Sequence, residues 1–303
     1  MASKRPVVAI AAALIAVAIG VGVVFLTGRT QPLETLMLRL PREGRVLARF
    51  DLDSLRNAGV LKPDSLSVEG DYKQFVAATG FHYQRDLDTV LLTYGAREAH
   101  MLLRGKFQFA RFQRYAEQNG GTCDGSVCRI KGTTPGVIVG FARIDRRTLA
   151  VTSSTNADAI LALLADPRVP VPLETPADPV WFLLPKAVLS EQLLPPAATV
   201  FATAALECAP AFLALGREQQ QLQARLDATC QSTEQAVQAV RELQAATTML
   251  TRVIGRETQS PDPATLSGIL TKGEFRNEGG RLRGTWPLDP AFVESLLGGP
   301  SAK

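Results

Sequence analysis

Histidine and aromatic side chains are scarce in this chain, and the motifs of common enzyme families are missing. The 303 residues include 2 His, and Phe, Trp and Tyr together make up 6%. No GxxxxGK(S/T), HExxH or GxSxG motif occurs, and no GxGxxG follows an expected strand. A Ser–His or Cys–His catalytic system would have to use His82 or His100. His100 lies in an expected strand, which favours a packed side chain. The sequence therefore indicates no catalytic residue and no cofactor site, and it argues against an enzyme.

An excess of charge of one sign is also missing beyond the first thirty residues. Of the +4 formal net charge, residues 1–30 contribute Lys4, Arg5 and Arg29 and no acidic side chain. The positive charge therefore flanks one apolar segment, and it does not indicate a surface for nucleic acid. The composition, 46% hydrophobic and 20% charged, is that of a globular protein.

One long apolar run is present, at residues 7–26. A helix of twenty residues spans roughly 30 Å, the thickness of the bilayer's hydrocarbon core. Lys4 and Arg5 precede the run, as expected for a cytoplasmic tail formed by residues 1–6. No A-x-A-like site follows it, although a cleaved signal peptide stays an alternative. We expect a single-pass anchor in the cytoplasmic (inner) membrane, with the body on the extracytoplasmic side.

Small residues occupy one side of the expected anchor. Ala12, Ala16 and Gly20 are spaced by four, which would let two membrane helices approach closely. This spacing would allow a homodimer through the anchor, although the alternative is the simpler interpretation. The alternative is that Ala and Gly are simply common in such segments.

The rest of the chain reads as two α+β bodies. Residues 27–44 form an expected spacer, and a first body at 45–166 contains strand, hairpin and helix patterns. Five prolines within 167–179 exclude a regular helix or inner strand and predict a linker. A second body at 180–298 follows, with a tail at 299–303.

The second body repeats the order of elements found in the first. A strand at 211–215, a turn at 216–218 and a strand at 222–230 mirror the earlier hairpin. Ser232 opens a capping box, after which the longest helix is expected. Residues 149–164 align with 282–297 at four identical positions. We expect two similar, mainly antiparallel sheet-plus-helix bodies, each with its own core. An internal duplication or two unrelated domains would both fit.

Two cysteines bracket a short turn in the first body. If Gly125 and Ser126 form a two-residue turn, Cys123 opposes Cys128 at a non-hydrogen-bonded position, within reach of a disulfide. Unpaired thiols are the alternative. A metal site lacks two further ligands, and we expect none. Cys208 and Cys230 fit either buried thiols or a second bridge.

A few polar and aromatic residues suggest sites, but each has a simpler interpretation. Asp51 and Asp53 resemble an acidic metal-binding pair, although Asp53 fits better as a helix cap. Asp86 and Asp88 could pair with Arg85 or Arg97 on a solvated edge. The only tryptophans, Trp181 and Trp286, could form a ligand wall, although a shared core or interdomain contact is the simpler reading.

The first body carries segments that suggest a known group of proteins. They are an aspartate-ended strand at 46–51, the run Ala77-Ala78-Thr79-Gly80-Phe81 and the segment Arg85-Asp86-Leu87-Asp88 before a hairpin. Over residues 45–165 the chain resembles uncharacterised, membrane-anchored exported bacterial proteins. The resemblance implies an extracytoplasmic α+β body, and it carries no functional residues.

Two classes of function follow from these observations. The first is a membrane-anchored envelope protein without catalytic activity, which binds a partner protein or an apolar ligand between its halves. The second is an envelope hydrolase whose acidic site is not recognisable from the sequence. A hydrolase should show acids converging in a cleft with perturbed pKa values. A binding module should show an apolar groove without such acids.

Overall fold

The computed structural model describes residues 30–61, 70–95, 98–166, 173–190, 196–218, 221–257, 261–289 and 291–292. The expected cytoplasmic tail (1–6), anchor (7–26) and C-terminal tail (299–303) lie outside these residues, as do Ala12, Ala16 and Gly20. Among the described helices, none combines the length and apolarity that crossing a membrane requires.

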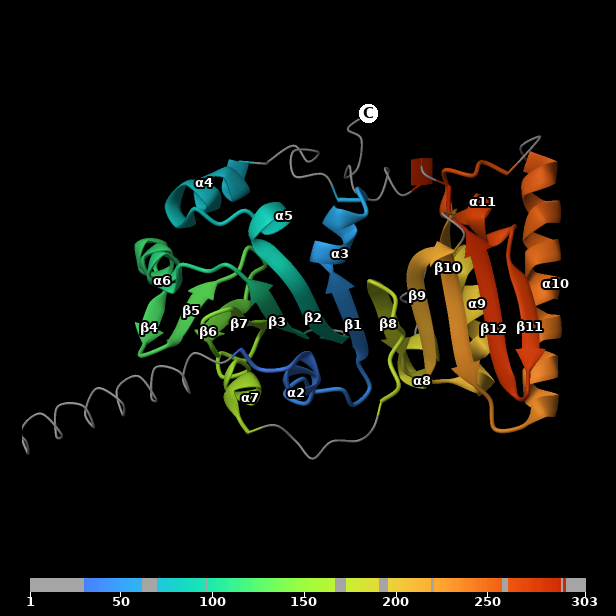
Figure 1. Cartoon of the computed structure of the whole chain (residues 1–303), viewed down its shortest axis with the longest axis horizontal. Coiled ribbons are helices and arrows are strands. Elements are labelled where there is room, and N and C mark those ends of the chain that lie inside the picture. The colour runs from blue at the N-terminus through green and yellow to red at the C-terminus, as the bar shows by residue number, and fades with distance from the viewer. Residues whose placement is uncertain are drawn as a thin grey trace, which may run out of the picture.

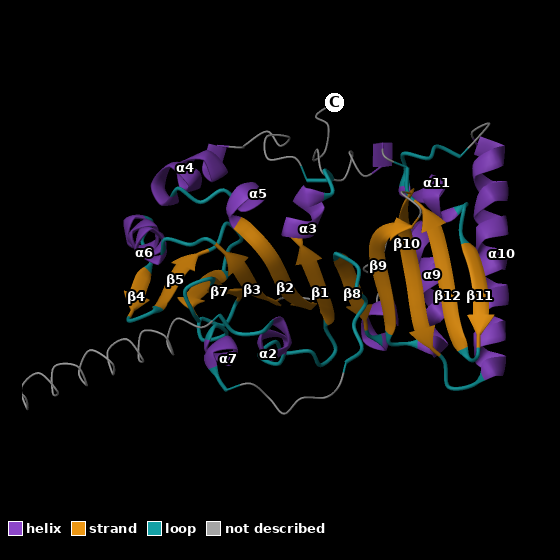
Figure 2. Cartoon of the chain, in the orientation of Figure 1, coloured by secondary structure: helices purple, strands orange, loops and turns teal. Residues whose placement is uncertain are grey.

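A single sheet of twelve strands runs through the molecule (Figures 1 and 2). The strands lie in the order β11-β12-β10-β9-β8-β1-β2-β3-β7-β6-β5-β4, and every neighbouring pair is antiparallel. The first half contributes β1 (Val46–Asp51), β2 (Leu87–Gly95), β3 (Glu98–Gly105), β4 (Thr122–Asp124), β5 (Val127–Lys131), β6 (Ile138–Arg143) and β7 (Thr148–Ser154). The second half contributes β8 (Val180–Leu184), β9 (Ala211–Glu218), β10 (Gln221–Thr229), β11 (Glu274–Glu278) and β12 (Arg281–Pro287). The expected α+β class with a mainly antiparallel sheet is confirmed.

The two halves share one strand order. In the first half the order is β1-β2-β3-β7-β6, with β5 and β4 added at the edge, and in the second it is β8-β9-β10-β12-β11. The helices of the first half are α2 (Leu33–Met37), α3 (Leu52–Asn57), α4 (Gly70–Thr79), α5 (Tyr83–Asp86), α6 (Phe109–Gln118) and α7 (Leu161–Leu164). Those of the second are α8 (Lys186–Ser190), α9 (Pro196–Ala205), η1 (Leu206–Cys208), α10 (Thr233–Glu257) and α11 (Leu266–Leu270). A helix follows the third strand in both halves, α6 after β3 and α10 after β10.

The halves join edge to edge through β1 and β8, so the structure differs from the expected pair of separate sheets. Leu47 pairs with Leu183, and Phe50 pairs with Val180. If the sheets were separate, β1 and β8 would both be edge strands with unpaired backbone groups. Their pairing satisfies these groups and buries Trp181 completely. The expected boundary at 167–179 therefore does not divide the sheet.

Side chains of the sheet point to one of two faces. The register of the β1–β8 pair makes each face continuous across the two halves. We call these faces the Leu47 face, which includes Trp181 and Ala214, and the Phe50 face, which includes Phe182 and Leu213. On the Leu47 face, α2 and α7 cover the first half. On the Phe50 face, α4, α5 and α6 pack on the first half, and α9, α10 and α11 pack on the second. The Leu47 face of the second half carries no helix among the described residues.

One of the three hydrophobic clusters crosses the junction between the halves. Leu47, Leu91 and Leu102 of the first half pack with Trp181 and Ala214 of the second. The halves therefore share part of their core, unlike the two independent cores expected from the sequence.

The segment expected to be a spacer is part of this shared core. Leu36 and Leu40 are each only 1% exposed and belong to the same cluster as Trp181. Leu33, Leu36, Met37 and Leu40 follow the spacing of a helical apolar face, which packs α2 against the sheet. Residues 33–40 are thus structural, in contrast to the spacer expected over 27–44.

The proline-rich stretch contains no helix or strand within its described part, residues 173–179. Its last residues are nonetheless fixed to the sheet. The Asp51 amide donates to the Pro179 carbonyl at 2.7 Å, and Arg225 pairs with Asp178. The stretch therefore returns the chain to the end of β1, beside which β8 begins.

Several smaller expectations can be compared with the structure. Ser232 accepts a hydrogen bond from the Gln235 amide at 3.2 Å and opens α10, which has 25 residues, as the capping box predicted. The cap of α3 is Asp51 rather than Asp53, because the helix begins at Leu52, two residues earlier than a cap at Asp53 implies. The expected turn at 216–218 lies within β9, because this strand continues to Glu218.

Both cysteine pairs form disulfides. Cys123 and Cys128 oppose each other across β4 and β5 with their Cα atoms 4.0 Å apart. Gly125 in the turn has a φ of 56°, which glycine adopts without strain. Cys208 and Cys230 form the second bridge and connect η1 to the end of β10.

Candidate functional site

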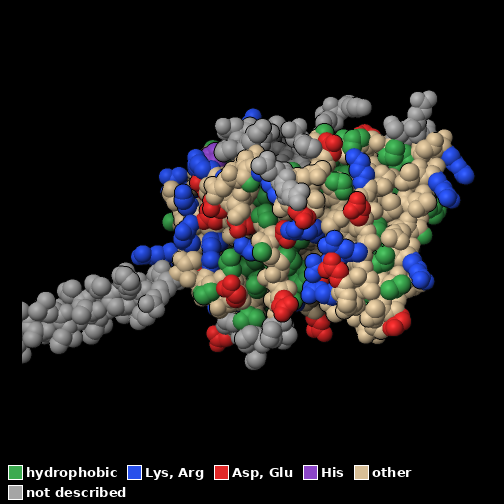
Figure 3. Space-filling view, turned by 45° about the vertical axis from the view of Figure 1, so that its right-hand side comes forward, with side chains coloured by type: hydrophobic (Ala, Val, Ile, Leu, Met, Phe, Trp, Pro, Cys, Tyr) green, Lys and Arg blue, Asp and Glu red, His purple; other side chains and the backbone are tan. Residues whose placement is uncertain are grey.

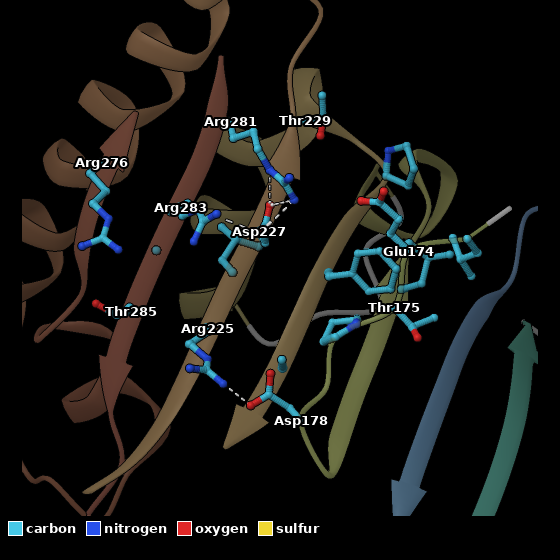
Figure 4. Close-up of a pocket in the computed structure, with 18 of the residues that line it drawn as sticks. Glu174, Thr175, Asp178, Arg225, Asp227, Thr229, Arg276, Arg281, Arg283 and Thr285 are labelled. Atoms are coloured by element: carbon cyan, nitrogen blue, oxygen red, sulfur yellow. Dashed lines mark hydrogen bonds and ion pairs between the residues drawn. The ribbon is translucent and has the colours of Figure 1, made fainter. Parts of the chain in front are cut away.

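The sheet of the second half presents a polar groove on its Leu47 face. The groove has a volume of about 630 Å³ and lies across β9, β10 and β12, beside the segment at 173–178 (Figure 4). Strand alternation places Arg225 and Asp227 on this side and Leu222 and Leu226 on the other. Basic and acidic side chains intermingle on the surface seen in Figure 3.

Each arginine of the groove has a carboxylate partner. Arg225 pairs with Asp178, Arg281 pairs with Asp227 at 2.9 Å, and Arg276 and Arg283 pair with Glu278 at 2.7 and 2.9 Å. The pairs of Arg276, Arg281 and Arg283 are partly solvent-exposed, where an ion pair contributes little stability, whereas Asp178 is largely buried. Because the guanidinium groups are already neutralised, the groove does not offer a strong site for an anion.

A larger apolar cavity lies on the Phe50 face at the junction of the halves. Its volume is about 820 Å³, within the range of small-molecule sites. The sheet forms one wall through Phe50, Phe182, Leu213 and Leu215. The helices that line it include α3, α9 and α11. Side chains of both halves are needed to build it.

Small side chains account for the empty volume of this cavity. Helix α9 presents Ala198, Ala202 and Ala205 to it, and only Phe201 of the same helix is large. Phe50 and Phe182 meet edge to face at 5.5 Å and hold the sheet wall across the junction. An alanine-rich helix cannot fill the space above this wall, and a pocket follows.

The lining is almost entirely hydrocarbon. Among the described residues that line the cavity, Arg217 is the only charged one. The hydroxyl of Ser54 and the indole N–H of Trp286 are the other polar side-chain groups. Such a lining favours an apolar ligand.

Titratable groups with perturbed pKa values lie outside this cavity, most of them on the first half. Burial lowers the pKa of His100, which lies between Thr93 and Thr152 in register. Burial raises the pKa of Glu98, but hydrogen bonds from Arg45 and Ser154 bring it below the usual value. The hydrogen bond from Arg85 lowers the pKa of Asp86. None of these groups lines the apolar cavity.

The candidate residues of the sequence analysis are dispersed. Asp51 caps α3, Asp53 pairs with Arg56, and Asp88 pairs with Arg56 and Arg147. No group of three possible metal ligands occurs among the residues that the structure describes. Among the described residues, Asp51 and Asp53 therefore have no further ligands with which to hold a metal ion.

The two tryptophans lie on opposite faces of the sheet and form no common wall. Trp181 packs against Phe212 in the core shared by the halves, whereas Trp286 lines the apolar cavity. Sequence reasoning missed the cavity itself and Arg217. Continuing the alternation Ala211, Leu213, Leu215 by one more step would have placed Arg217 on the same face.

Comparisons with known proteins show similarity only at the level of solved structures. No protein-family model and no curated protein matches the chain. Crystal form IV of TP0453 covers 88% of this chain and 96% of its own, with 14% identity and a TM-score of 0.44. Crystal forms I and III of TP0453 cover 87% and 89% of this chain, with 13% identity and TM-scores of 0.46.

Proposed function

We propose that this chain is a membrane-anchored, extracytoplasmic envelope protein that binds a long apolar ligand and has no catalytic activity. The observation that carries the proposal is the cavity of about 820 Å³ on the Phe50 face. Burying hydrocarbon in such a site contributes about 0.8 kcal/mol per methylene group. The alternative is an envelope hydrolase, but Asp178 and Asp227 of the polar groove are held in ion pairs with arginine.

Binding of 1-hexadecanol tests the ligand class. We expect the full-length protein, held in digitonin micelles, to bind radiolabelled hexadecanol saturably. Tetradecanol, with two methylene groups fewer, should bind roughly 15-fold more weakly when both affinities are referred to the free aqueous alcohol and corrected for partition into the micelles. Equal affinity for both alcohols, or no saturable binding, would contradict an apolar site that encloses the chain.

A cavity-filling substitution assigns this binding to the cavity. Leu215 is half-buried and lines the sheet wall, so Leu215→Trp should reduce hexadecanol affinity at least tenfold. The matched control is Phe212→Trp, on the same strand but on the Leu47 face. The control should bind as wild type, and equal loss in both variants would indicate general damage instead.

The membrane anchor at 7–26 and the extracytoplasmic body are part of the same proposal. Two disulfides support an oxidising compartment, since cytosolic thiols are kept reduced. Full-length protein should stay in the membrane pellet after a carbonate wash, because twenty apolar residues partition strongly into the bilayer. A variant without residues 2–29 is the control and should be released. Release of a naturally shortened body would contradict the anchor.

We also propose that the two halves arose by internal duplication. The shared strand order supports this, because β1-β2-β3-β7-β6 corresponds position by position to β8-β9-β10-β12-β11. Leu149 in β7 and Leu282 in β12, which the sequence alignment matches, lie on corresponding strands. On this proposal the cavity formed where the two copies joined.

A further inference from the structure

Arg217 stands apart from the other residues of the apolar cavity. It is the only charged residue among the described lining residues, and its side chain is exposed. A residue that both lines the cavity and contacts solvent lies at the opening. Arg217 therefore marks one place where the cavity meets water, and Ser54, Ala58 and Leu266 are further exposed residues of the lining.

The strand register fixes this position at one end of the sheet wall. Ala211, Leu213, Leu215 and Arg217 follow one another on the Phe50 face of β9. The six-residue step from Ala211 to Arg217 spans about 20 Å of extended strand. This row of side chains, which we call the track, is apolar from Ala211 to Leu215 and ends at the cationic Arg217. It reaches the end of the sheet at which β1 passes into α3.

The guanidinium group of Arg217 has no ion-pair or hydrogen-bond partner in the part of the chain that the structure describes. Arg225 on the adjacent strand, which faces the polar groove, pairs with Asp178. Arginine presents a rigid fork of donors that matches a carboxylate in two parallel hydrogen bonds. The described lining of the apolar cavity thus carries one cation and no acidic side chain that could neutralise it.

We infer that the cavity takes a long-chain fatty acid, with its carboxylate at Arg217 and its alkyl chain along the track to Ala211. The inference rests on the proposed function, and it adds the identity of the head group and the direction of the ligand. One negative charge matches the one positive charge of the lining. Water reaches Arg217, so the carboxylate stays partly hydrated while the alkyl chain leaves water.

The test compares palmitate with hexadecanol, which has the same chain length and no charge. Full-length protein in digitonin micelles is titrated with each radiolabelled ligand. Wild type should bind palmitate at least tenfold more tightly than hexadecanol, as expected for a charge-assisted contact. Arg217→Gln should remove this preference and leave hexadecanol affinity within twofold. Arg217→Lys should restore part of it.

Arg276→Gln is the matched control, because Arg276 lies on the opposite face of the sheet and does not line the cavity. It should keep the wild-type preference for palmitate. Equal affinity of wild type for both ligands, or equal loss of both in Arg217→Gln, overturns the role of Arg217 but leaves the proposed function standing. Failure of hexadecanol to bind wild type overturns the proposed function itself. Displacement of palmitate by lysophosphatidate at tenfold lower concentration overturns the carboxylate as the preferred head group.

Discussion

His100 is a buried histidine, 3% exposed, whose ring nitrogen Nδ1 has no hydrogen-bond partner among the described residues. Burial and the nearby Arg45 lower its pKa in the folded protein, and Glu98 only partly opposes them. The unfolded chain therefore takes up a proton first as the pH falls. Stability is greatest above the unfolded pKa of about 6.5 and declines below it, towards the lower folded pKa.

We predict that the free energy of unfolding decreases between pH 7 and pH 5 and that His100→Gln reduces this decrease. Urea denaturation followed by tryptophan fluorescence measures it, since both tryptophans are buried, Trp181 in the cluster shared by the halves and Trp286 within the second half. His82→Gln controls for the loss of a histidine elsewhere. An unchanged slope in His100→Gln would show that other groups cause the pH dependence.

At the scale of single elements, helix α10 depends on its N-terminal cap. Ser232 accepts from the Gln235 amide, and the Gln235 side chain accepts from the Gln231 amide at 3.1 Å. We predict that Ser232→Ala lowers the free energy of unfolding by about 1 kcal/mol. Thr248→Ala, on the exposed side of the same helix, is the control and should be neutral or slightly stabilising. Equal decreases in the free energy of unfolding of the two variants would show that the cap hydrogen bond makes no contribution of its own.

Local patterns in the sequence predicted local elements well. The alternation in 222–230 identified β10 and its two faces, and the cysteine spacing fitted the β4–β5 hairpin. Helix α9 was missed because its alanine and threonine residues form no apolar stripe of large side chains. The cavity was missed for the same reason, since an empty volume results from side chains that are too small to fill it.

Long-range pairing was the part that the sequence could not provide. Nothing in Val46–Asp51 or Val180–Leu184 specifies that these strands pair with each other rather than end two sheets. Val180–Leu184 is apolar on both faces, which suits an inner strand, whereas Val46–Asp51 carries Arg49 and Asp51 on one face. The sequence can therefore indicate an inner strand, but it does not indicate which other strand pairs with it.

At the scale of the whole molecule, the β1–β8 junction should hold the halves together without a continuous chain. We predict that a protein with a protease site inserted between Arg168 and Val169 stays associated after cleavage. The shared cluster of Leu47, Leu91 and Trp181 would be exposed to water if the halves separated. Affinity purification through a C-terminal tag should recover both fragments.

Trp181→Ala in the same cleavable protein should release the fragments at lower urea concentration, because a fully buried side chain is lost. The uncleaved protein is the control for unfolding. Spontaneous separation of the wild-type fragments would favour two independent bodies.

At the junction, β8 adds to the open edge that β1 would otherwise present. Strand addition of this kind can repeat, because each added strand presents a new edge. If the outer edges were equally receptive, further molecules could add and the sheet would grow into a fibre. At one end β4 is only three residues long, and its hairpin is closed by the Cys123–Cys128 bridge. At the other end β11 carries Glu274, Arg276 and Glu278 on alternate positions, and α10 packs beside it. A short, cross-linked strand and a charged strand are both poor templates for another chain, so neither outer edge of the sheet favours the addition of a further molecule.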